Sequence, residues 1–350
     1  MEILFSIRDL HKHYRVGRKK RGGRVEEVTL KAVDGLSFDI YKGETFGVVG
    51  ESGSGKSTLG RCMLNLIKLT RGSVLFRGKP IESLAPWEMK SLRQDMQMVF
   101  QNPSSSFNPK LTIGKTLRNV AYFYGMGRLE GQERINQLLA YVNLDKTVLS
   151  RRSEELSGGQ LQRLAIVRAL IPSPSFIMAD EPVSALDVSV QAQILNLLDD
   201  MKEKFGLTMM FISHELTVVE HICDRILVLY LGNIVEIGDT RDLFSRTTHP
   251  YTRALIASKP KLFPEEETGR IMLEGEIPNA LEIPPGCRFY TRCPSAMAGR
   301  CDTEAPPLYQ IAGGHWVACY LARDAAREYS LGVPYDSAKF SLEINVSNGV

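Results

Sequence analysis

The 350-residue sequence has no uninterrupted apolar segment near the roughly 20 residues that a membrane-spanning helix needs. Its first residues lack the basic region, the long apolar stretch and the small-residue cleavage site of a secretion signal. Internal repeats and low-complexity segments are absent, and the net charge of +3 is too small to indicate a nucleic-acid partner. We therefore expect a soluble, cytosolic protein that reaches a membrane only through partner proteins.

The composition is otherwise that of an ordinary globular chain. Hydrophobic residues make up 43% of the sequence and charged residues 24%, as in typical folded domains. A chain of 350 residues can bury one large core together with a smaller appendage. Residues 18–24 form a local basic run, for which we expect a solvated loop; attraction to anionic lipid headgroups is the alternative.

Cysteine is sparse in most of the chain and concentrated near its end. Cys62 and Cys223 stand alone, and we expect both to be small buried thiols. The other four cysteines are Cys287, Cys293, Cys301 and Cys319. In a cytosolic chain such a group indicates a metal more than disulfides. The C-x2-C pairs of zinc ribbons are missing, so the spacing leaves zinc, an iron–sulfur cluster and unmetallated thiols open.

The octapeptide at residues 50–57, Gly-Glu-Ser-Gly-Ser-Gly-Lys-Ser, fits the phosphate-binding pattern G-x-x-x-x-G-K-[ST]. A buried strand at 45–49 precedes it, and a helix at 57–69 is expected to follow. Glycines let backbone N–H groups wrap the phosphates at the positive end of that helix. We expect Lys56 to reach the β- and γ-phosphates and Ser57 to bind Mg²⁺. The predicted nucleotide contacts in this loop are Gly50, Ser52, Gly53, Gly55, Lys56, Ser57 and Thr58.

A second apolar run, at residues 176–179, ends in the carboxylates Asp180 and Glu181. ATP hydrolysis needs a divalent ion and an oriented water, and two carboxylates at a strand end can serve both. We expect Asp180 to hold Mg²⁺. Because side chains alternate near a strand end, Glu181 should point in a different direction.

Strands alternate with helices over most of the chain, which predicts an α/β core containing parallel strands. Further strands are expected at 3–7, 30–33, 36–40, 96–100, 208–212, 226–231 and 233–237, and helices at 161–171, 190–204 and 216–223. From 102 to 153 the pattern is helical. Beyond about residue 250 proline becomes dense and periodicity fades, which predicts a compact loop-rich module that needs a staple.

The hexapeptide Leu-Ser-Gly-Gly-Gln-Leu at 156–161 lies between the glycine-rich loop and the carboxylates. With all three elements in this order, the sequence resembles the ATP-binding cassette (ABC) ATPases. The resemblance implies a P-loop NTPase core of the ABC type, with a mixed sheet and a helical subdomain at about 102–170. It also implies binding of ATP and Mg²⁺ and hydrolysis of ATP.

The same resemblance implies roles for residues outside the loop. Glu181 would be the base that polarises the attacking water, and His214 would contact the γ-phosphate. Gln101 would touch Mg²⁺ and a transmembrane partner, and Tyr14 would stack on adenine. The segment Ser157, Gly158, Gly159 and Gln160 would complete the site of an opposite subunit, and Asp187 would lie in the loop that links the two sites. Two cassettes should therefore close on two ATP molecules.

The C-terminal part carries a second resemblance. His-Pro-Tyr-Thr-Arg-Ala-Leu at 249–255 and Gly-Cys-Arg-Phe-Tyr-Thr-Arg-Cys-Pro at 286–294 look like the extension of oligopeptide/dipeptide permease ATPases. Members of that group can bind a [4Fe–4S] cluster there, which favours the cluster over zinc. His315 could donate a hydrogen bond near Cys319, although a surface histidine is the simpler expectation. The domains implied are a cassette at 1–250, the four-cysteine extension at 251–322 and a tail at 323–350.

The whole set of motifs looks most like the second ATPase subunit of such permeases. This implies an importer of di- or oligopeptides, with a homologous second ATPase, two transmembrane permease subunits and an extracytoplasmic binding protein as partners, and no nucleic acid. The chain would sit peripherally on the cytoplasmic face of the membrane. Nickel complexes, glutathione and oligosaccharides are alternative cargoes, since cargo is chosen elsewhere in such transporters. A non-transport cassette ATPase is the remaining alternative.

Overall fold

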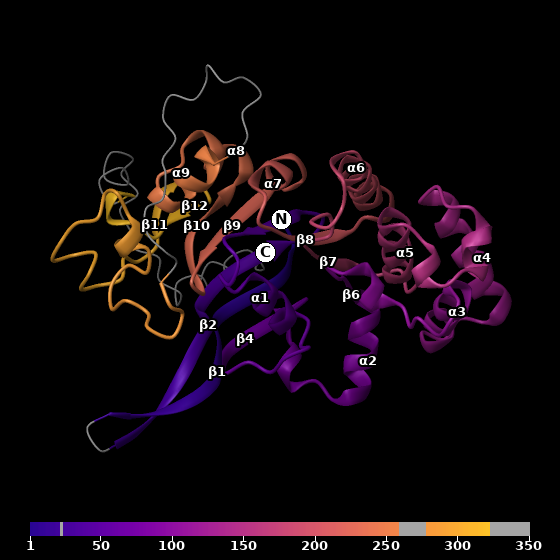
Figure 1. Cartoon of the computed structure of the whole chain (residues 1–350), viewed down its shortest axis with the longest axis horizontal. Helices are drawn as coiled ribbons and strands as arrows, with labels where there is room; N and C mark the ends of the chain where they lie inside the picture. The colour runs from indigo at the N-terminus through magenta and orange to yellow at the C-terminus, as the bar shows by residue number, and fades with distance from the viewer. Residues whose placement is uncertain (22–23, 259–277, 323–350) are drawn as a thin grey trace, which may run out of the picture. The chain divides into compact units, whose positions relative to one another are not determined.

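The computed structural model describes residues 1–21, 24–258 and 278–322 (Figure 1). By the contacts among its residues the chain divides into two units. The first unit consists of residues 1–2, 41–46 and 83–213, and the second of residues 3–40, 47–82 and the chain from 214 onward. The predicted tail at 323–350 lies outside the described residues.

The first unit is built on three parallel strands, β6 (Met96–Val99), β7 (Phe176–Asp180) and β8 (Thr208–Ser213). β7 lies in the middle, with Phe176 opposite Met96 on one side and Thr208 on the other. Strands β7 and β8 are buried along their whole length, which is why their sequences are continuous rather than alternating apolar runs. These three strands were expected from the sequence and are confirmed.

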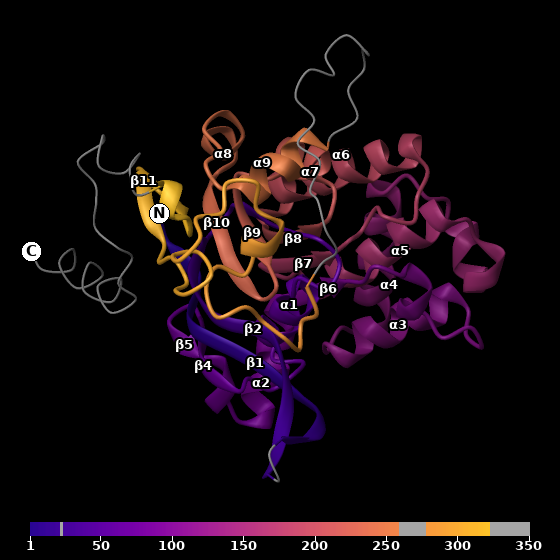
Figure 2. The same ribbon diagram turned by 60° about the vertical axis from the view of Figure 1, so that its left-hand side comes forward.

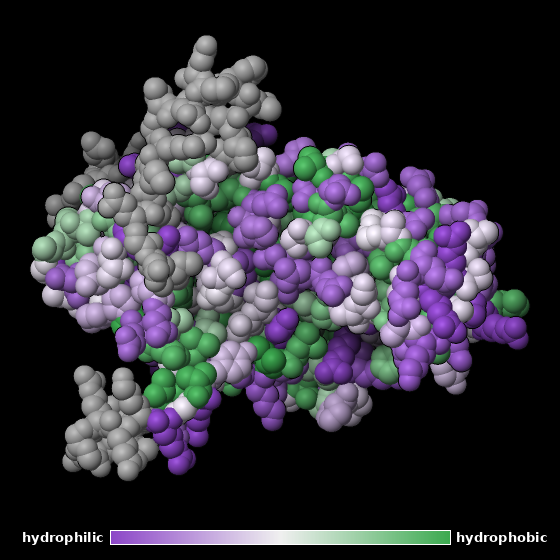
Figure 3. All heavy atoms as spheres, viewed as in Figure 1, coloured by the Kyte–Doolittle hydropathy of each residue, from purple (hydrophilic) through white to green (hydrophobic). Residues whose placement is uncertain are grey.

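Helices make up most of the rest of the first unit. They are α2 (Pro86–Asp95), α3 (Ile113–Phe123), α4 (Arg128–Tyr141), α5 (Gly158–Leu170) and α6 (Val188–Phe205), with short 3-10 turns η2 (Pro103–Ser106), η3 (Lys146–Ser150) and η4 (Ser153–Glu155). The helical pattern at 102–153 is confirmed, because α3 and α4 lie there and contact each other through buried residues such as Leu117 and Ile135. Hydrophilic side chains gather over α3 and α4 on the face drawn in Figure 3.

The second unit contains two groups of strands. The first group has the order β2-β1-β4-β5, seen side by side in Figure 2. Its members are β1 (Ile3–Arg21), β2 (Arg24–Tyr41), β4 (Arg71–Phe76) and β5 (Lys79–Pro80). β1 and β4 are antiparallel with Phe5 opposite Phe76, and these two buried rings lie 4.9 Å apart between centroids.

The other group in the second unit has the order β11-β12-β10-β9-β3. Its members are β3 (Thr45–Val49), which begins in the first unit, β9 (Arg225–Tyr230), β10 (Asn233–Asp239), β11 (Tyr309–Ala312) and β12 (His315–Val317). β9 and β10 form the expected hairpin around Gly232. Because parallel pairs occur in one unit and antiparallel pairs in the other, the chain is mixed α/β, as predicted.

The second unit has four helices among its described residues. They are α1 (Lys56–Met63), α7 (Leu216–Ile222), α8 (Thr240–Ser245) and α9 (Pro250–Ala257). The expectation that the first of them would reach residue 69 was wrong. The helix ends at Met63 because Asn65 adopts a left-handed conformation, with φ of 49°, which no regular helix contains. None of the described helices combines the length and apolar character needed to cross a bilayer.

The prediction of a loop for the basic run at residues 18–24 was also wrong. β1 continues to Arg21 and β2 resumes at Arg24, so the residues described there are extended strand. β1 and β2 are hydrogen-bonded neighbours, and this pairing overrides the low strand propensity of the lysines. The predictions also missed seven elements that are short or lie in proline-rich sequence: α2, α8, α9, β4, β5, β11 and β12.

Gly72 is the second residue of β4 and Gly78 lies in the turn between β4 and β5, so the two glycines can be compared as probes of how closely the strands approach each other. Both have left-handed backbones, with φ of 91° and 75°, but a Cβ at Gly72 would lie 2.1 Å from the Asp9 carbonyl oxygen, whereas a Cβ at Gly78 meets no atom within 4 Å. We expect Gly72→Ala to lower the free energy of unfolding by about 2 to 4 kcal/mol and Gly78→Ala by about 1 kcal/mol. Urea unfolding of the two variants measures the difference. Equal losses would show that the strands move apart at no cost.

Candidate functional site

The glycine-rich loop joins β3 to α1 within the second unit. Gly50, Gly53 and Gly55 all have positive φ, at 153°, 78° and 105°. A Cβ at Gly50 would lie 2.2 Å from the carbonyl oxygen of Leu229, and one at Gly55 would lie 2.2 Å from that of Ala32. No side chain fits at these two positions. The loop therefore presents bare backbone, as phosphate binding requires.

Lys56 lies folded over its own loop. Its ammonium group donates to the carbonyl oxygens of Gly50 at 2.7 Å and Glu51 at 3.0 Å, and the side chain is buried. Ser57 and Thr58 follow in the first turn of α1, and that turn contains no acidic residue. The positive end of the helix is thus uncompensated by a nearby carboxylate, which favours an anion such as a phosphate group.

In the first unit, β7 ends at Asp180 and Glu181 follows it directly, so strand alternation does not extend to Glu181. Asp180 is buried, whereas Glu181 is partly exposed and has a left-handed backbone, with φ of 46°. The Glu181 amide donates to the carbonyl oxygen of Ile212 at 2.9 Å, which holds this unfavourable conformation. Gln101 lies beside Glu181 and donates from its Nε2 to the Glu181 carboxylate at 2.9 Å. Two residues predicted for the site are thus brought together, although 80 positions separate them.

The Ser157 segment forms the start of α5. Ser157 is the N-cap: its hydroxyl accepts from the Gln160 amide at 3.3 Å, and the Gln160 side chain accepts in return from the Ser157 amide at 3.1 Å. Ser157 and Gly158 are exposed. Gly159 has no room for a larger residue, because a Cβ there would lie 2.8 Å from Val190 of α6. The segment is therefore a rigid, exposed helix N-terminus.

The remaining predicted nucleotide contacts are accessible. His214 directly follows β8 and its side chain is 49% exposed, with Nε2 3.9 Å from the Glu215 carboxylate. Tyr14 lies on β1, partly exposed, with the Lys12 ammonium 4.7 Å from its ring centroid. Asp187 is the exposed N-cap residue of α6. The roles assigned to these side chains remain predictions.

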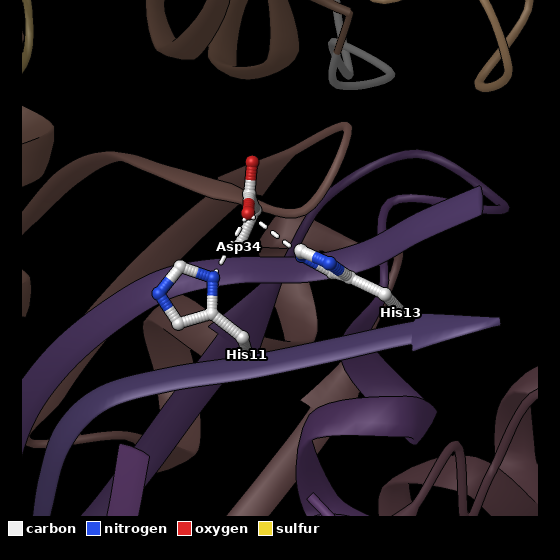
Figure 4. Close-up of side chains that lie close together, drawn as sticks. All are labelled: His11, His13 and Asp34. Carbon is white, nitrogen blue, oxygen red and sulfur yellow. Dashed lines mark hydrogen bonds and ion pairs between the residues drawn. The ribbon is translucent and has the colours of Figure 1, made fainter. Parts of the chain in front are cut away.

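Sequence reasoning missed a charged cluster centred on Asp34 in the second unit (Figure 4). One Asp34 oxygen lies 2.9 Å from Nδ1 of His11 and 2.8 Å from Nε2 of His13. The other oxygen pairs with Arg288 and lies 3.4 Å from the Lys31 ammonium. Burial alone would raise the pKa of Asp34, but the hydrogen bonds from His13 and His11 and the charge of Arg288 hold it well below its usual range.

The Asp34 cluster places three potential metal-ligating atoms within 4.8 Å of one another. Two cations, Arg288 and Lys31, already neutralise the carboxylate. The cluster therefore acts as an ion network that ties β1 and β2 to the C-terminal part of the second unit. The signal that could have revealed it is the His-x-His pattern on one strand, because alternate residues of a strand share a face.

The four C-terminal cysteines line a common small pocket, together with His249 and Phe289 among others. All four are free thiols. Burial raises the pKa of Cys287 to about 12 and that of Cys319 to about 11, and it also raises the pKa of Cys293. These groups are neutral thiols unless a cation stabilises their thiolates. The structure thus brings together the residues that the sequence grouped.

His249 is the other notable member of this pocket. Burial lowers its pKa to about 4, against a smaller opposing effect of Glu236, so the imidazole is neutral at physiological pH. Its Nδ1 accepts from the Tyr251 amide at 3.1 Å, which places the proton on Nε2. This buried Nε2–H has no hydrogen-bond partner among the described residues.

His315 is not a surface histidine, as the sequence had suggested. It is fully buried and its Nε2 lies 2.9 Å from the carboxylate of Glu236. Glu236 also accepts from the backbone amides of Thr248 and His249. A buried carboxylate on β10 needs such partners, and the sequence contains no local sign of this requirement.

Comparison with known proteins agrees with these features. Residues 33–184 match the family model described as ABC transporter, and residues 235–301 match the one described as oligopeptide/dipeptide transporter, C-terminal region. A putative peptide import ATP-binding protein of Brucella ovis is 48% identical over 317 residues, which cover 90% of this chain and 97% of that protein. This chain belongs to the ABC transporter ATPases.

Further relatives and a solved structure also place the chain in this family. The oligopeptide transport ATP-binding protein AppF of Bacillus subtilis is 44% identical over 91% of this chain and 98% of that protein. The corresponding protein OppF of Escherichia coli is 43% identical over 91% and 96%. A solved dimeric ATP-binding cassette in a post-hydrolysis state, bound to ADP and Pi, aligns with TM-score 0.60 and 28% identity over 68% of this chain and 99% of that one. The chain is therefore an α/β ATPase of the ABC type that binds and hydrolyses ATP.

Asp34 should make the free energy of unfolding of the ATPase depend on pH in the acid range. Its pKa is lowered from 3.8 by folding, so its stabilising effect is complete above about pH 4 and is lost as the pH falls further. At neutral pH we expect Asp34→Asn to lower the free energy of unfolding by about 3 kcal/mol, since removing one partner leaves buried charges unpaired. Denaturant titrations from pH 7 to pH 2.5 should show the gap between wild type and variant shrinking below about pH 4.

Asp9→Asn is the matched control for Asp34→Asn. Asp9 also contacts His11, but its side chain is 46% exposed. Asp9→Asn should therefore change the free energy of unfolding little. A gap between wild type and Asp34→Asn that stays constant down to pH 2.5 would contradict the ion network.

Proposed function

We propose that this chain is the ATP-hydrolysing subunit of an importer for di- or oligopeptides. The observation that carries the proposal is the match of residues 235–301 to the C-terminal region of oligopeptide/dipeptide transporters, added to an ABC core. Relatives named for peptide import or oligopeptide transport align over nearly their whole length. The ATPase would work on the cytoplasmic face of a membrane beneath two permease subunits that receive cargo from an extracytoplasmic binding protein.

An aromatic hollow in the first unit supports a permease partner. It has a volume of about 720 Å³ and is lined by Trp87, Tyr122 and Phe123 among others. Trp87 is 75% exposed and Tyr122 is 82% exposed, which is unusual for large apolar side chains unless a partner covers them.

For the chemistry, we propose that Lys56 leaves its loop carbonyls and binds the β- and γ-phosphates of ATP. Ser57, Gln101 and Asp180 would hold Mg²⁺, which neutralises phosphate charge. Glu181 would accept a hydrogen bond from the attacking water and orient it. The amide of Gln101 already holds the Glu181 carboxylate in place, so the base is positioned before substrate arrives.

The exposed start of α5 supports a dimer of cassettes. The first N–H groups of a helix have no intrahelical acceptors, and here they belong to Gly158 and Gly159, which have no side chain to obstruct a phosphate. We propose that Ser157, Gly158 and Gly159 bind the γ-phosphate of ATP held by a second, homologous ATPase. The partner would do the same in return, so that hydrolysis requires both.

For the cysteine pocket we propose a [4Fe–4S] cluster bound by Cys287, Cys293, Cys301 and Cys319. Zinc needs its sulfurs close together: bonds of about 2.3 Å in a tetrahedron put them about 3.8 Å apart. Within the described chain, the cysteines do not form a group of ligating atoms within 4.8 Å of one another. A four-iron cube holds thiolates farther apart, at its corners. The unpartnered Nε2–H of His249 supports a sulfur-rich occupant, because cluster sulfur can accept that hydrogen bond.

The Glu181→Gln variant tests the catalytic proposal. Removing the base should lower ATP hydrolysis by about 100-fold or more while ATP binding is kept, so that an ATP-bound dimer accumulates. Phosphate release and size-exclusion chromatography with the partner ATPase measure both effects. Glu133→Gln, on the exposed face of α4, is the control that should hydrolyse ATP normally. Unchanged hydrolysis by Glu181→Gln would exclude Glu181 as the base.

Cargo is tested by reconstituting the complete transporter in vesicles with its binding protein. Loaded with di- or oligopeptides, the binding protein should stimulate ATP hydrolysis by wild type and not by Glu181→Gln. Stimulation by nickel complexes, glutathione or oligosaccharides instead would overturn the peptide cargo and keep the transporter. No stimulation by any solute would argue for a non-transport ATPase.

Metal analysis of anaerobically purified protein tests the cysteine pocket. We expect iron and acid-labile sulfide in equal amounts, with broad visible absorption, and loss of both in Cys293→Ala. Cys62→Ala is the control that should retain them, because Cys62 is buried in α1, which contributes no residue to the cysteine pocket. Zinc without visible absorption would overturn the cluster, and protein free of metal would overturn any metal site.

A further inference from the structure

The second residue of the phosphate-binding loop, Glu51, is held from the C-terminal part of the second unit. Its carboxylate accepts two hydrogen bonds from the guanidinium group of Arg292, at 2.8 and 3.0 Å. Arg292 precedes Cys293 directly, and 241 positions separate it from Glu51. The Arg292 side chain is 7% exposed and that of Glu51 22%, so this is a shielded, bidentate ion pair of the strong kind.

A second contact holds the backbone of the same loop residue. The Glu51 amide donates to the hydroxyl of Tyr251, at 2.9 Å. The Tyr251 ring is fully buried and packs against Tyr230 and Phe289, with centroids 4.7 and 5.3 Å away. The hydroxyl is therefore fixed in position by a rigid aromatic cluster. Tyr230 also accepts a hydrogen bond from Arg292 at 3.3 Å, which links the two contacts.

These contacts reach the phosphate-binding lysine. The carbonyl oxygen of Glu51 accepts from Lys56 at 3.0 Å, so one residue carries a bond to Arg292, a bond to Tyr251 and a bond to Lys56. A loop that is ordered before ATP binds does not have to be ordered by ATP binding. The C-terminal contacts thus supply part of the preorganisation that the glycines alone would lack.

A second arginine, Arg288, contacts the strands against which the phosphate-binding loop packs. Arg288 donates to the carbonyl oxygen of Leu231 and pairs with Asp34. Gly232, which follows Leu231, donates a hydrogen bond from its amide to the carbonyl oxygen of Ser54 at 2.9 Å. The carbonyl oxygen of Gly232 accepts a hydrogen bond from the Asp34 amide at 3.0 Å. The segment between Cys287 and Cys293 therefore contacts the phosphate-binding loop through one arginine and its supporting hairpin through another.

We propose that Arg292 and Tyr251 are positioning residues of the phosphate-binding loop, so that the C-terminal extension sets the affinity of this ATPase for ATP. Both side chains contact the loop at Glu51. They act through Glu51, whose placement they fix from two sides. The extension is then part of the nucleotide-binding machinery in addition to any role in holding a metal or a neighbouring subunit.

The test measures ATP affinity and the kinetic constants of the full-length protein. For Arg292→Gln we expect the dissociation constant of a fluorescent ATP analogue, and KM for ATP, to rise about tenfold, the effect of losing one net ion-paired hydrogen bond. kcat should stay within about twofold, because the groups that act on the transition state are untouched. Arg292→Lys keeps the positive charge but loses the bidentate hydrogen bonds of the guanidinium group. Its dissociation constant for the ATP analogue should therefore lie between those of wild type and Arg292→Gln.

Controls separate positioning from folding of the extension. Arg300→Gln is matched: Arg300 lies in the same extension, stacks on the Tyr320 ring at 4.1 Å, and should leave ATP affinity unchanged. Tyr251→Phe keeps the aromatic packing and removes only the hydroxyl, so it still tests the proposal if Arg292→Gln unfolds. Thermal unfolding and metal content of each variant show whether the extension is intact.

A double-mutant cycle with Glu51→Gln decides between direct coupling and a general effect. If Arg292 acts through Glu51, the double variant should bind ATP no more weakly than the worse single variant. Additive losses, or normal ATP affinity in Arg292→Gln and Tyr251→Phe, would overturn the proposal. A fall in kcat with KM unchanged would also overturn it. None of these outcomes depends on which metal, if any, the cysteines bind.

Discussion

The nucleotide site depends first on how closely the backbone of residues 50–55 approaches neighbouring strands. Gly50 and Gly55 lie against the carbonyl oxygens of Leu229 and Ala32 at separations that no Cβ tolerates. The loop is therefore built against a wall made by β9 and β2, and this wall must itself be held in place. Arg288, in the C-terminal part of the second unit, contacts both strands of this wall. It donates to the carbonyl oxygen of Leu231 at the β9–β10 turn and pairs with Asp34 on β2. Close backbone contact thus shapes the glycine-rich loop, and side chains from a segment distant in the sequence contact the strands against which the loop packs.

Short-range features of the fold could be predicted because they are encoded by local rules. The strands β3, β7 and β8 are continuous apolar runs next to glycine or carboxylates, and the structure contains each of them. The loop at 50–57 and the hexapeptide at 156–161 are contiguous motifs whose conformation follows from glycines and a capping serine. Errors occurred where tertiary contacts decide, as at residues 18–21, where pairing with β2 extends a strand through a basic run.

Long-range side-chain pairs could not be predicted in the same way. Nothing near Glu51 in the sequence indicates that its partner is Arg292, 241 positions away, or that Tyr251 approaches its amide. The same holds for His315, which looks like a surface residue until β12 pairs with β10 and buries it against Glu236. Such pairs depend on the relative placement of segments, whereas sequence patterns report only which face of a segment is apolar.

The position of Glu181 shows how far strand alternation describes the end of β7. Strand alternation predicts that Asp180 and Glu181 point apart, but β7 ends at Asp180 and alternation no longer applies to the next residue. A left-handed backbone turns Glu181 instead, and the hydrogen bond from its amide to Ile212 offsets part of that strain. The carboxylate then meets Gln101, the first residue after β6 that the sequence had singled out. The Glu181 carboxylate thus lies beside the Gln101 amide at a position where the backbone is strained rather than extended.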